Sequence, residues 1–314
     1  MSDFATSGGH QLGIDISGTV INAAIIDHDA HIIERDTAPL SPDNIIAQIA
    51  DATARMRGMV PTLTAAGVSV PGLVNHQTNR VEVSHELPGI TQPDFNSALS
   101  QALGLPVRLE NDANAAAYGE YHYGAGRGCR NLFFATIGIG VGGALILNGE
   151  LWCGVAGYAG EFGHIIINAD DDATLEMMAS AENIVRRTKK RLDQDATSSL
   201  SPLSALERFT VYDITQAAHH DGDDFACMMI ERTGKFIGLA IANVINLLNV
   251  ERIVIGGTVA DMAGLPIIDA IRRECERHAF SPNFATTAIV PALLGVDAAM
   301  LGSALLAHKA TMKG

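Results

Sequence analysis

The chain has 314 residues, of which 47% are hydrophobic and 31 are glycine, and its formal net charge is -14. This length and composition predict two globular domains, each with its own core, and exclude a largely disordered chain. The negative charge disfavours binding to nucleic acid or to an anionic membrane, because both need clusters of Lys and Arg.

The cysteines and the apolar segments indicate where such a chain works. The four cysteines are scattered without a CxxC pair, so neither a zinc knuckle nor a disulfide framework is expected, and a reducing cytoplasm is the expected compartment. Met1 to His10 lacks the features of a signal peptide. Phe236 to Val250 is too short to span a membrane and predicts a buried core helix.

The first half of the chain alternates strands and helices. Leu12 to Asp27 predicts a β-hairpin, and Ser41 followed by Pro42 predicts a helix start. The elements expected after these are a strand over Ala66 to Val70, a turn at Pro71-Gly72, a helix over Pro93 to Leu103, a strand over Val107 to Glu110 and an Ala-rich helix beginning near Asp112.

The second half repeats this plan, beginning with a second hairpin over Phe133 to Gly149. The elements expected after it are a strand over Ile165 to Ile167, helical segments between Thr174 and Leu248, an exposed loop over Asp193 to Ser201, a strand over Arg252 to Ile255 and a helix over Ala298 to His308. Strands mixed with helices predict α/β layers, and the two hairpins suggest two related halves.

Two turns are candidates for binding phosphate. Asp15, Gly18 and Thr19 lie in a turn where Gly18 permits close backbone approach and the other two offer oxygen ligands. Gly138 to Gly143 holds four glycines, which suits backbone N–H groups that face phosphate oxygens. An ordinary hairpin turn is the simpler explanation of the first motif taken alone, whereas four glycines exceed what a plain hairpin turn needs in the second. A strand rather than a helix follows Gly143, which argues against a Rossmann site and an NAD-dependent dehydrogenase.

Two polar segments are candidates for substrate chemistry. Glu110 to Asn114 places carboxylates and amides at the end of a strand, where ligands gather in α/β sheets, although Asn111 or Asp112 is equally well explained as a helix N-cap. Glu161, His164 and Glu176 offer hydrogen-bonding partners for several sugar hydroxyls, although a histidine before an apolar run is more often structural.

Small residues form the last candidate motif. Gly256 and Gly257 follow an apolar strand, and Gly302-Ser303-Ala304 lies in the last helix. Small residues admit a flat adenine ring close to the backbone, and each of the two segments is also explained by packing alone.

Taken in order, these segments resemble the ROK family of sugar kinases and repressors, from about Gly13 to Leu306. Asp15-Ile16-Ser17-Gly18-Thr19 is similar to the family's first phosphate motif, and Glu110 to Asn114 to its catalytic segment. The other matches are Gly138 to Gly143 with the second phosphate motif, Glu161 to His164 and Leu175-Glu176 with the sugar motifs, and Val254 to Thr258 with the adenosine-side turn.

The resemblance implies an actin-like ATPase fold with a small lobe (1-112 and 299-314), a large lobe (113-298) and a central cleft. It implies ATP-dependent phosphorylation of a hexose or N-acetylhexosamine in a cytoplasmic homodimer, with Asp112 as general base and Asp15 placing Mg-ATP. The implied sugar-binding residues are Gly72, Glu86, Asn111, Asp112, Glu161, His164 and Glu176. The implied nucleotide-binding residues are Asp15, Gly18, Thr19, Gly138, Ile139, Gly140, Gly142, Gly256 and Gly257.

The chain departs from the family pattern in several places. Ile165 to Leu175 contains no cysteine, so the family's zinc site is not expected. Ile139 stands where the family's Thr contacts phosphate, Ser17 replaces a Gly, and Glu86 stands where an Asn often reaches the sugar. These changes weaken the expectation of an efficient kinase.

Two alternatives within the family remain. A sugar-responsive repressor carries a helix-turn-helix domain, and the dozen residues before the first strand leave no room for one, while the net charge argues the same way. A catalytically weak sugar-binding protein is the second alternative, favoured by Ile139. The sequence distinguishes neither the sugar nor ATP from polyphosphate as donor.

Overall fold

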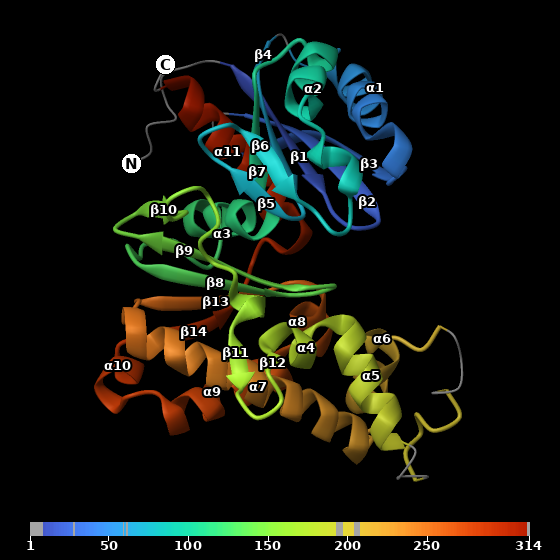
Figure 1. The fold of residues 1–314 in the computed structure, drawn as a ribbon, viewed down its shortest axis with the longest axis vertical. Coiled ribbons are helices and arrows are strands. Elements are labelled where there is room, and N and C mark those ends of the chain that lie inside the picture. The colour runs from blue at the N-terminus through green and yellow to red at the C-terminus, as the bar shows by residue number, and fades with distance from the viewer. Residues whose placement is uncertain are drawn as a thin grey trace. The chain divides into compact units, whose positions relative to one another are not determined.

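The computed structural model describes residues 9–27, 29–58, 60, 62–192, 197–203 and 208–312 (Figure 1). It divides into two compact units. The first comprises the chain up to Gly128, Leu145–Ala159 and the chain from Val296, and the second comprises Cys129–Ala144 and Gly160–Gly295. The helix beginning at Asp112 thus groups with the first sheet, whereas the lobes expected from the sequence divide after Asp112; that division stays a prediction.

A five-stranded sheet, in the order β3-β2-β1-β4-β7, forms the centre of the first unit. β1 pairs antiparallel with β2 and parallel with β4, which pairs parallel with β7. The strands are β1 (His10–Ile16), β2 (Val20–Ile26), β3 (Ile32–Pro39), β4 (Leu63–Val70) and β7 (Val107–Asn111), with a separate ribbon of β5 (Leu73–Asn75) and β6 (Arg80–Val83). The helices are α1 (Ile45–Arg57), α2 (Phe95–Leu103), α3 (Asp112–Tyr123) and α11 (Ala298–Met312).

The two faces of β1 differ because side chains alternate along a strand. Leu12, Ile14 and Ile16 are fully buried in a hydrophobic core shared with α1 and α2. Gln11 points the other way and contacts His308 of α11, with 3.0 Å between Nε2 and Nδ1. Asp15 shares this second face, since it lies four residues from Gln11.

Helix α3 packs directly on α11, as Figure 1 shows for the green and red helices. Ala113 to Glu120 of α3 are all buried, which explains why the segment is rich in alanine. A Cβ atom on Gly302 would overlap the backbone oxygen of Ala115, and one on Gly119 would overlap that of Ala298. The two backbones therefore touch, and only glycine fits at these crossing points.

The second sheet repeats the strand order of the first, as β10-β9-β8-β13-β14. Its strands are β8 (Leu132–Ile137), β9 (Val141–Leu147), β10 (Glu150–Trp152), β13 (Arg252–Gly256) and β14 (Ala288–Pro291), and β11 (Ile166–Asn168) with β12 (Ala173–Thr174) forms a separate ribbon. The helices are α4 (Leu175–Ala179), α5 (Ala181–Leu192), α6 (Val211–His219), α7 (Asp224–Leu248), α8 (Thr258–Ala263), α9 (Leu265–His278) and α10 (Ser281–Ala285). In both sheets an antiparallel hairpin joins parallel strands, so the expectation of two related halves is confirmed.

Most elements expected from the sequence are present, with shifted ends. Pro42 begins a 3₁₀ turn, and α1 itself begins at Ile45. The core helix expected over Phe236 to Val250 is the second half of α7. No helix in the described parts of the chain is long and apolar enough to cross a membrane. Residues 1–8, expected to lack a signal peptide, and 193–196 of the expected loop lie outside the described residues.

We predict that Gly302→Ala destabilises the protein by at least about 2 kcal/mol, because the new methyl group forces α3 and α11 apart. Gly58→Ala is the matched control, since a Cβ atom there has nothing within 4 Å and φ is -67°. That control should be neutral or stabilising by about 0.4–1 kcal/mol. Urea denaturation of both variants is the measurement, and equal midpoints would contradict the prediction.

Candidate active site

The carboxyl ends of β1, β4 and β7 meet at one edge of the first sheet. The parallel register places Asp15 beside Ser69 and Ser69 beside Glu110. The Ser69 hydroxyl donates a hydrogen bond to Asp15 Oδ1. Ligands gather at such edges in α/β proteins, and this one presents two carboxylates on the same face.

Asp15 and Asp112 share an electrostatic environment that favours their neutral forms. Burial raises the pKa of Asp15 above its usual value, although hydrogen bonds from Ser69 and Asn22 act against this. Burial, together with the charges of Asp15 and Glu86, raises the pKa of Asp112 to about 7. A carboxyl group with such a pKa can accept a proton near neutral pH, and a neighbouring cation would hold both groups in the charged form.

Asn111 is the N-cap of α3. Its Oδ1 accepts a hydrogen bond from the backbone N–H of Asn114 at 3.1 Å, and its Nδ2 donates to the backbone oxygen of Gly72 at 3.1 Å and to Asp112 Oδ1 at 3.0 Å. The capping role that the sequence left open between two residues therefore belongs to Asn111. Asp112 lies in the first turn of α3 and is oriented by the hydrogen bond from Asn111. The other hydrogen bond from Asn111 Nδ2 places the backbone of Gly72 next to these two residues.

The first expected phosphate motif forms the turn between β1 and β2. The backbone N–H of Ser17 donates to the oxygen of Val20 at 3.1 Å, and the N–H of Leu40 donates to the oxygen of Thr19 at 2.9 Å. Gly18 is half-buried and Thr19 is exposed. The turn thus follows Asp15 directly, and its contact with phosphate stays a prediction.

The second expected phosphate motif is held by Glu176, a contact that the sequence analysis missed. Glu176 Oε2 accepts the backbone N–H of Val141 at 2.9 Å, and a Cβ atom on Gly140 would lie 2.9 Å from the same oxygen. The backbone oxygen of Gly138 accepts the N–H of Ala181 at 2.8 Å, so the start of α5 holds the other end of the turn. No local pattern links positions 35 residues apart.

The remaining glycines of this site lie around the same turn. Gly142 lies in β9, and Ile139 at the tip is 59% exposed. Gly257 has φ of 92°, and a Cβ atom there would overlap the backbone of Ile137 at the end of β8. The pair Gly256 and Gly257 therefore lies against the strand that leads into the Gly138 turn. The structure brings together the two motifs of the second unit that were expected to bind nucleotide.

Glu161 precedes a 3₁₀ turn that ends with His164, with 3.9 Å between Glu161 Oε2 and His164 Nε2. Burial raises the pKa of Glu161, His164 lowers it, and Glu176 raises it. Both side chains are well exposed, at 46% and 73%. These residues and Glu176 belong to the second unit, whereas Gly72, Glu86, Asn111 and Asp112 belong to the first.

A family model described as "ROK family" matches residues 11–310. The chain belongs to the ROK family. A glucokinase of Streptomyces coelicolor is 31% identical over 96% of this chain and 98% of its own length. The ROK family glucokinase of Streptomyces griseus, solved in complex with glucose and AMPPNP, is 30% identical, has a TM-score of 0.84 and covers 96% of this chain and 100% of its own. These matches confirm the actin-like ATPase fold expected from the sequence.

A ROK repressor is also similar to this chain. The xylose repressor of Caldicellulosiruptor bescii is 30% identical over 75% of this chain and 60% of its own length. Family membership is therefore compatible with both catalysis and regulation, and the choice between them depends on residues within the site.

We predict that Glu176→Ala lowers the stability of this ROK protein, because the partly buried amide of Val141 loses its acceptor, at a cost of about 1–3 kcal/mol. Glu176→Gln keeps an amide oxygen in the same position and should lose less. Urea denaturation without ligand measures both. Equal losses in the two variants would contradict the assigned hydrogen bond.

Proposed function

We propose that the chain is an ATP-dependent sugar kinase that phosphorylates a hydroxyl of a hexose or N-acetylhexosamine. The observation that carries the proposal is the Asp112 carboxyl group, which Asn111 orients and whose pKa is raised to about 7. Similarity to glucokinases over nearly the whole chain supports the same activity.

Asp112 acts as general base in this proposal. A sugar hydroxyl is a weak nucleophile, and a carboxylate that accepts its proton during attack makes the oxygen reactive. A base works best when its pKa lies near the working pH, which the burial of Asp112 and its carboxylate neighbours provide. Asn111 fixes the carboxylate toward the substrate, and we assign sugar binding to Gly72, Glu86, Asn111, Glu161, His164 and Glu176.

Asp15 fits the metal that accompanies ATP. Mg²⁺ prefers oxygen ligands, and Asp15 supplies a carboxylate beside the Ser69 hydroxyl. The carboxyl groups of Asp112 and Glu86 add negative charge that would attract the cation. When bound, Mg²⁺ would offset the charge of the phosphate oxygens. The backbone N–H groups of the Gly18 and Gly138 turns would donate to those oxygens, as a protein of net charge -14 requires.

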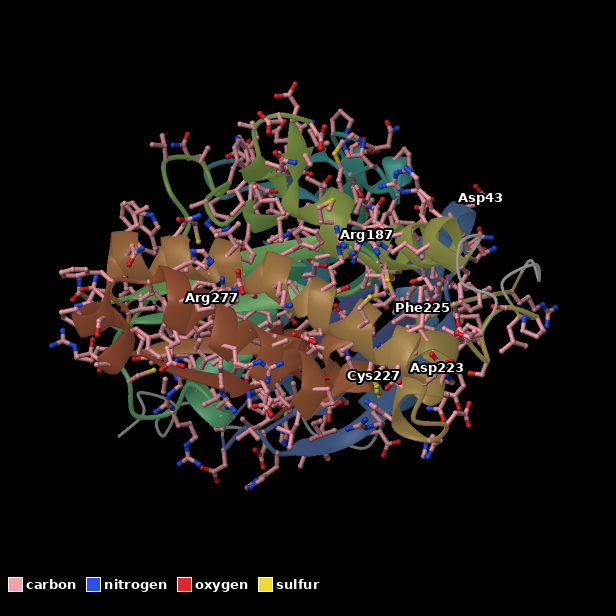
Figure 2. All side chains as sticks on the ribbon, turned by 90° about the horizontal axis from the view of Figure 1, so that it is seen from below. Asp43, Arg187, Asp223, Phe225, Cys227 and Arg277 are labelled. Carbon is pink, nitrogen blue, oxygen red and sulfur yellow. The ribbon has the colours of Figure 1, made fainter. Side chains whose placement is uncertain are left out.

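We predict that Asp112→Asn lowers turnover by roughly 10²- to 10⁴-fold while sugar binding persists, because only the proton acceptor is lost. The measurement is coupled ADP release across a panel of hexoses and N-acetylhexosamines, with polyphosphate as a second donor and calorimetry for sugar binding. Asp43→Asn is the control, since Asp43 is an exposed carboxylate (Figure 2) that is not among the residues assigned to the site.

Two outcomes would count against the proposal. Unchanged turnover in Asp112→Asn would remove Asp112 as the base. Sugar binding by the wild type without phosphoryl transfer from either donor would instead favour the catalytically weak binding protein, for which the exposed Ile139 in the phosphate turn is the specific observation.

We predict that Ile139→Thr lowers the KM for ATP roughly three- to tenfold, because a hydroxyl at the tip of the turn adds one hydrogen bond worth about 0.5–1.5 kcal/mol. Ile139→Val is the matched control, since it shortens the side chain without adding a donor. Initial rates at saturating sugar give the KM values. If Thr and Val variants behave alike, position 139 does not contact the phosphates.

A further inference from the structure

His76, Glu110 and Cys153 form a cluster of three metal-ligating side chains in the first unit. One ligand atom from each lies within 4.8 Å of the others. His76 Nε2 and Glu110 Oε1 are 2.9 Å apart, and the Glu110 side chain is only 1% exposed. None of the three is assigned to sugar or nucleotide, and no other such group occurs within the described ranges.

The backbone holds this cluster in place independently of the side chains. The N–H of His76 donates to the oxygen of Ala156 at 2.9 Å. The N–H groups of Gly157 and Ala159 both donate to the oxygen of Cys153 at 3.1 Å. Gly157 has φ of 115°, and a Cβ atom there would overlap the oxygen of Val74. The loop that carries Cys153 is thus fixed against the segment that carries His76.

Asn114 provides a second, independent observation. It is 1% exposed, and its Oδ1 is buried without a hydrogen-bond partner. Its Nδ2 points into the cluster, 3.0 Å from Glu110 Oε1 and 4.0 Å from Cys153 Sγ. A half turn of this amide group would place the oxygen where the nitrogen now lies, within reach of a metal ion in the cluster, and would leave the nitrogen in the present position of the oxygen.

We propose that His76, Glu110 and Cys153 bind a zinc ion, with the amide oxygen of Asn114 as fourth ligand. Imidazole, thiolate and carboxylate are the ligands of zinc in proteins, and a thiolate disfavours Mg²⁺ and Ca²⁺. Tetrahedral zinc holds its nitrogen and oxygen ligands roughly 3.4 Å apart and its sulfur roughly 3.6 Å from them, from the usual bond lengths. The ligand atoms of His76, Glu110 and Cys153 lie within 4.8 Å of one another, so changes of roughly 1.2 Å or less in their separations would reach this geometry.

The surroundings of Glu110 suit a metal ligand. Arg108 Nη2 lies 3.4 Å from Glu110 Oε2, and the N–H of Asn111 donates to Oε1 at 3.0 Å, so one oxygen faces the guanidinium and the other faces the cluster. Such outer contacts orient a ligating carboxylate. His76 is 21% exposed, which leaves the ion a path from solvent.

This zinc site differs from the one whose cysteines are missing from Ile165 to Leu175. Its ligands come from β7, α3, the residue after β5 and the loop at Cys153. Glu110 directly precedes Asn111, and a bound ion would stiffen the strand end from which the cap of α3 begins. The proposed role is structural and does not depend on whether the chain is a kinase.

The test uses the full chain, titrated with zinc against a chromogenic chelator and analysed for bound metal after gel filtration. We expect about one zinc per chain in the wild type and in Cys227→Ser, which changes an exposed cysteine of α7 in the second unit (Figure 2). Cys153→Ser and His76→Ala should each weaken binding by roughly 100-fold or more, since even outer contacts are worth 10- to 100-fold.

Cobalt substitution identifies the sulfur ligand directly. The wild type and Cys227→Ser should show a thiolate-to-cobalt charge-transfer band in the near ultraviolet, and Cys153→Ser should lack it. Circular dichroism checks that each variant is folded. Absence of zinc from the wild type, or equal zinc and cobalt binding in Cys153→Ser, would overturn the proposal.

Discussion

The backbone contact between α11 and its neighbours is the constraint on which the first unit depends. Cβ atoms at Gly13 of β1, Gly67 of β4 and Gly119 of α3 would each overlap a backbone oxygen of α11. No side chain separates the helix from the sheet at these points. Helix α11 therefore fixes α3 against the strands whose ends carry Asp15 and Glu110, and the start of α3 is where Asp112 lies.

That arrangement concentrates acidic groups at the strand ends. Burial and mutual repulsion raise the pKa of Asp112, and burial raises that of Asp15, so folding the empty protein costs free energy at this place. Hydrogen bonds from Ser69 and Asn111 offset part of the cost. The cation and the substrate hydroxyl of the proposed function would offset more of this cost, as expected where a functional site is kept at the expense of stability.

The framework of the fold could be predicted from the sequence because residues within a few positions of one another specify each of its elements. Both hairpins, the strand at Val107 and the Ala-rich helix follow from apolar runs, turn residues and small side chains within a few positions. β3 was missed because it is half-exposed along its whole length, with Glu34, Arg35 and Asp36 in its centre. The residues of β3 therefore lack the apolar pattern of a buried strand. The segment is a strand because it pairs with β2.

The site was predicted less completely because its decisive contacts are distant in sequence. Asn111 and Asp112 are equally good caps by residue type, and only the hydrogen bond from Asn114 distinguishes them. Glu176 was expected only as a sugar ligand, a role that stays a proposal, and its hydrogen bond from the Val141 N–H was not foreseen. His76 and Cys153 are far apart along the chain, and the backbone hydrogen bond from His76 to Ala156 holds the Cys153 loop beside His76.

The two related halves have specialised in opposite ways. In the first hairpin, Asp15 lies near the end of β1, and the turn after it contains one glycine. Asp15 lies near a second carboxyl group, that of Asp112. The second hairpin has four glycines in its turn, and Glu176 acts there on a backbone N–H group. Under the proposed kinase function, the first half would supply groups that accept a proton or a cation, and the second would supply backbone donors for an anion. The proposed transfer of a phosphoryl group to a hydroxyl would need both kinds of group, so the same strand order would serve two different chemical tasks.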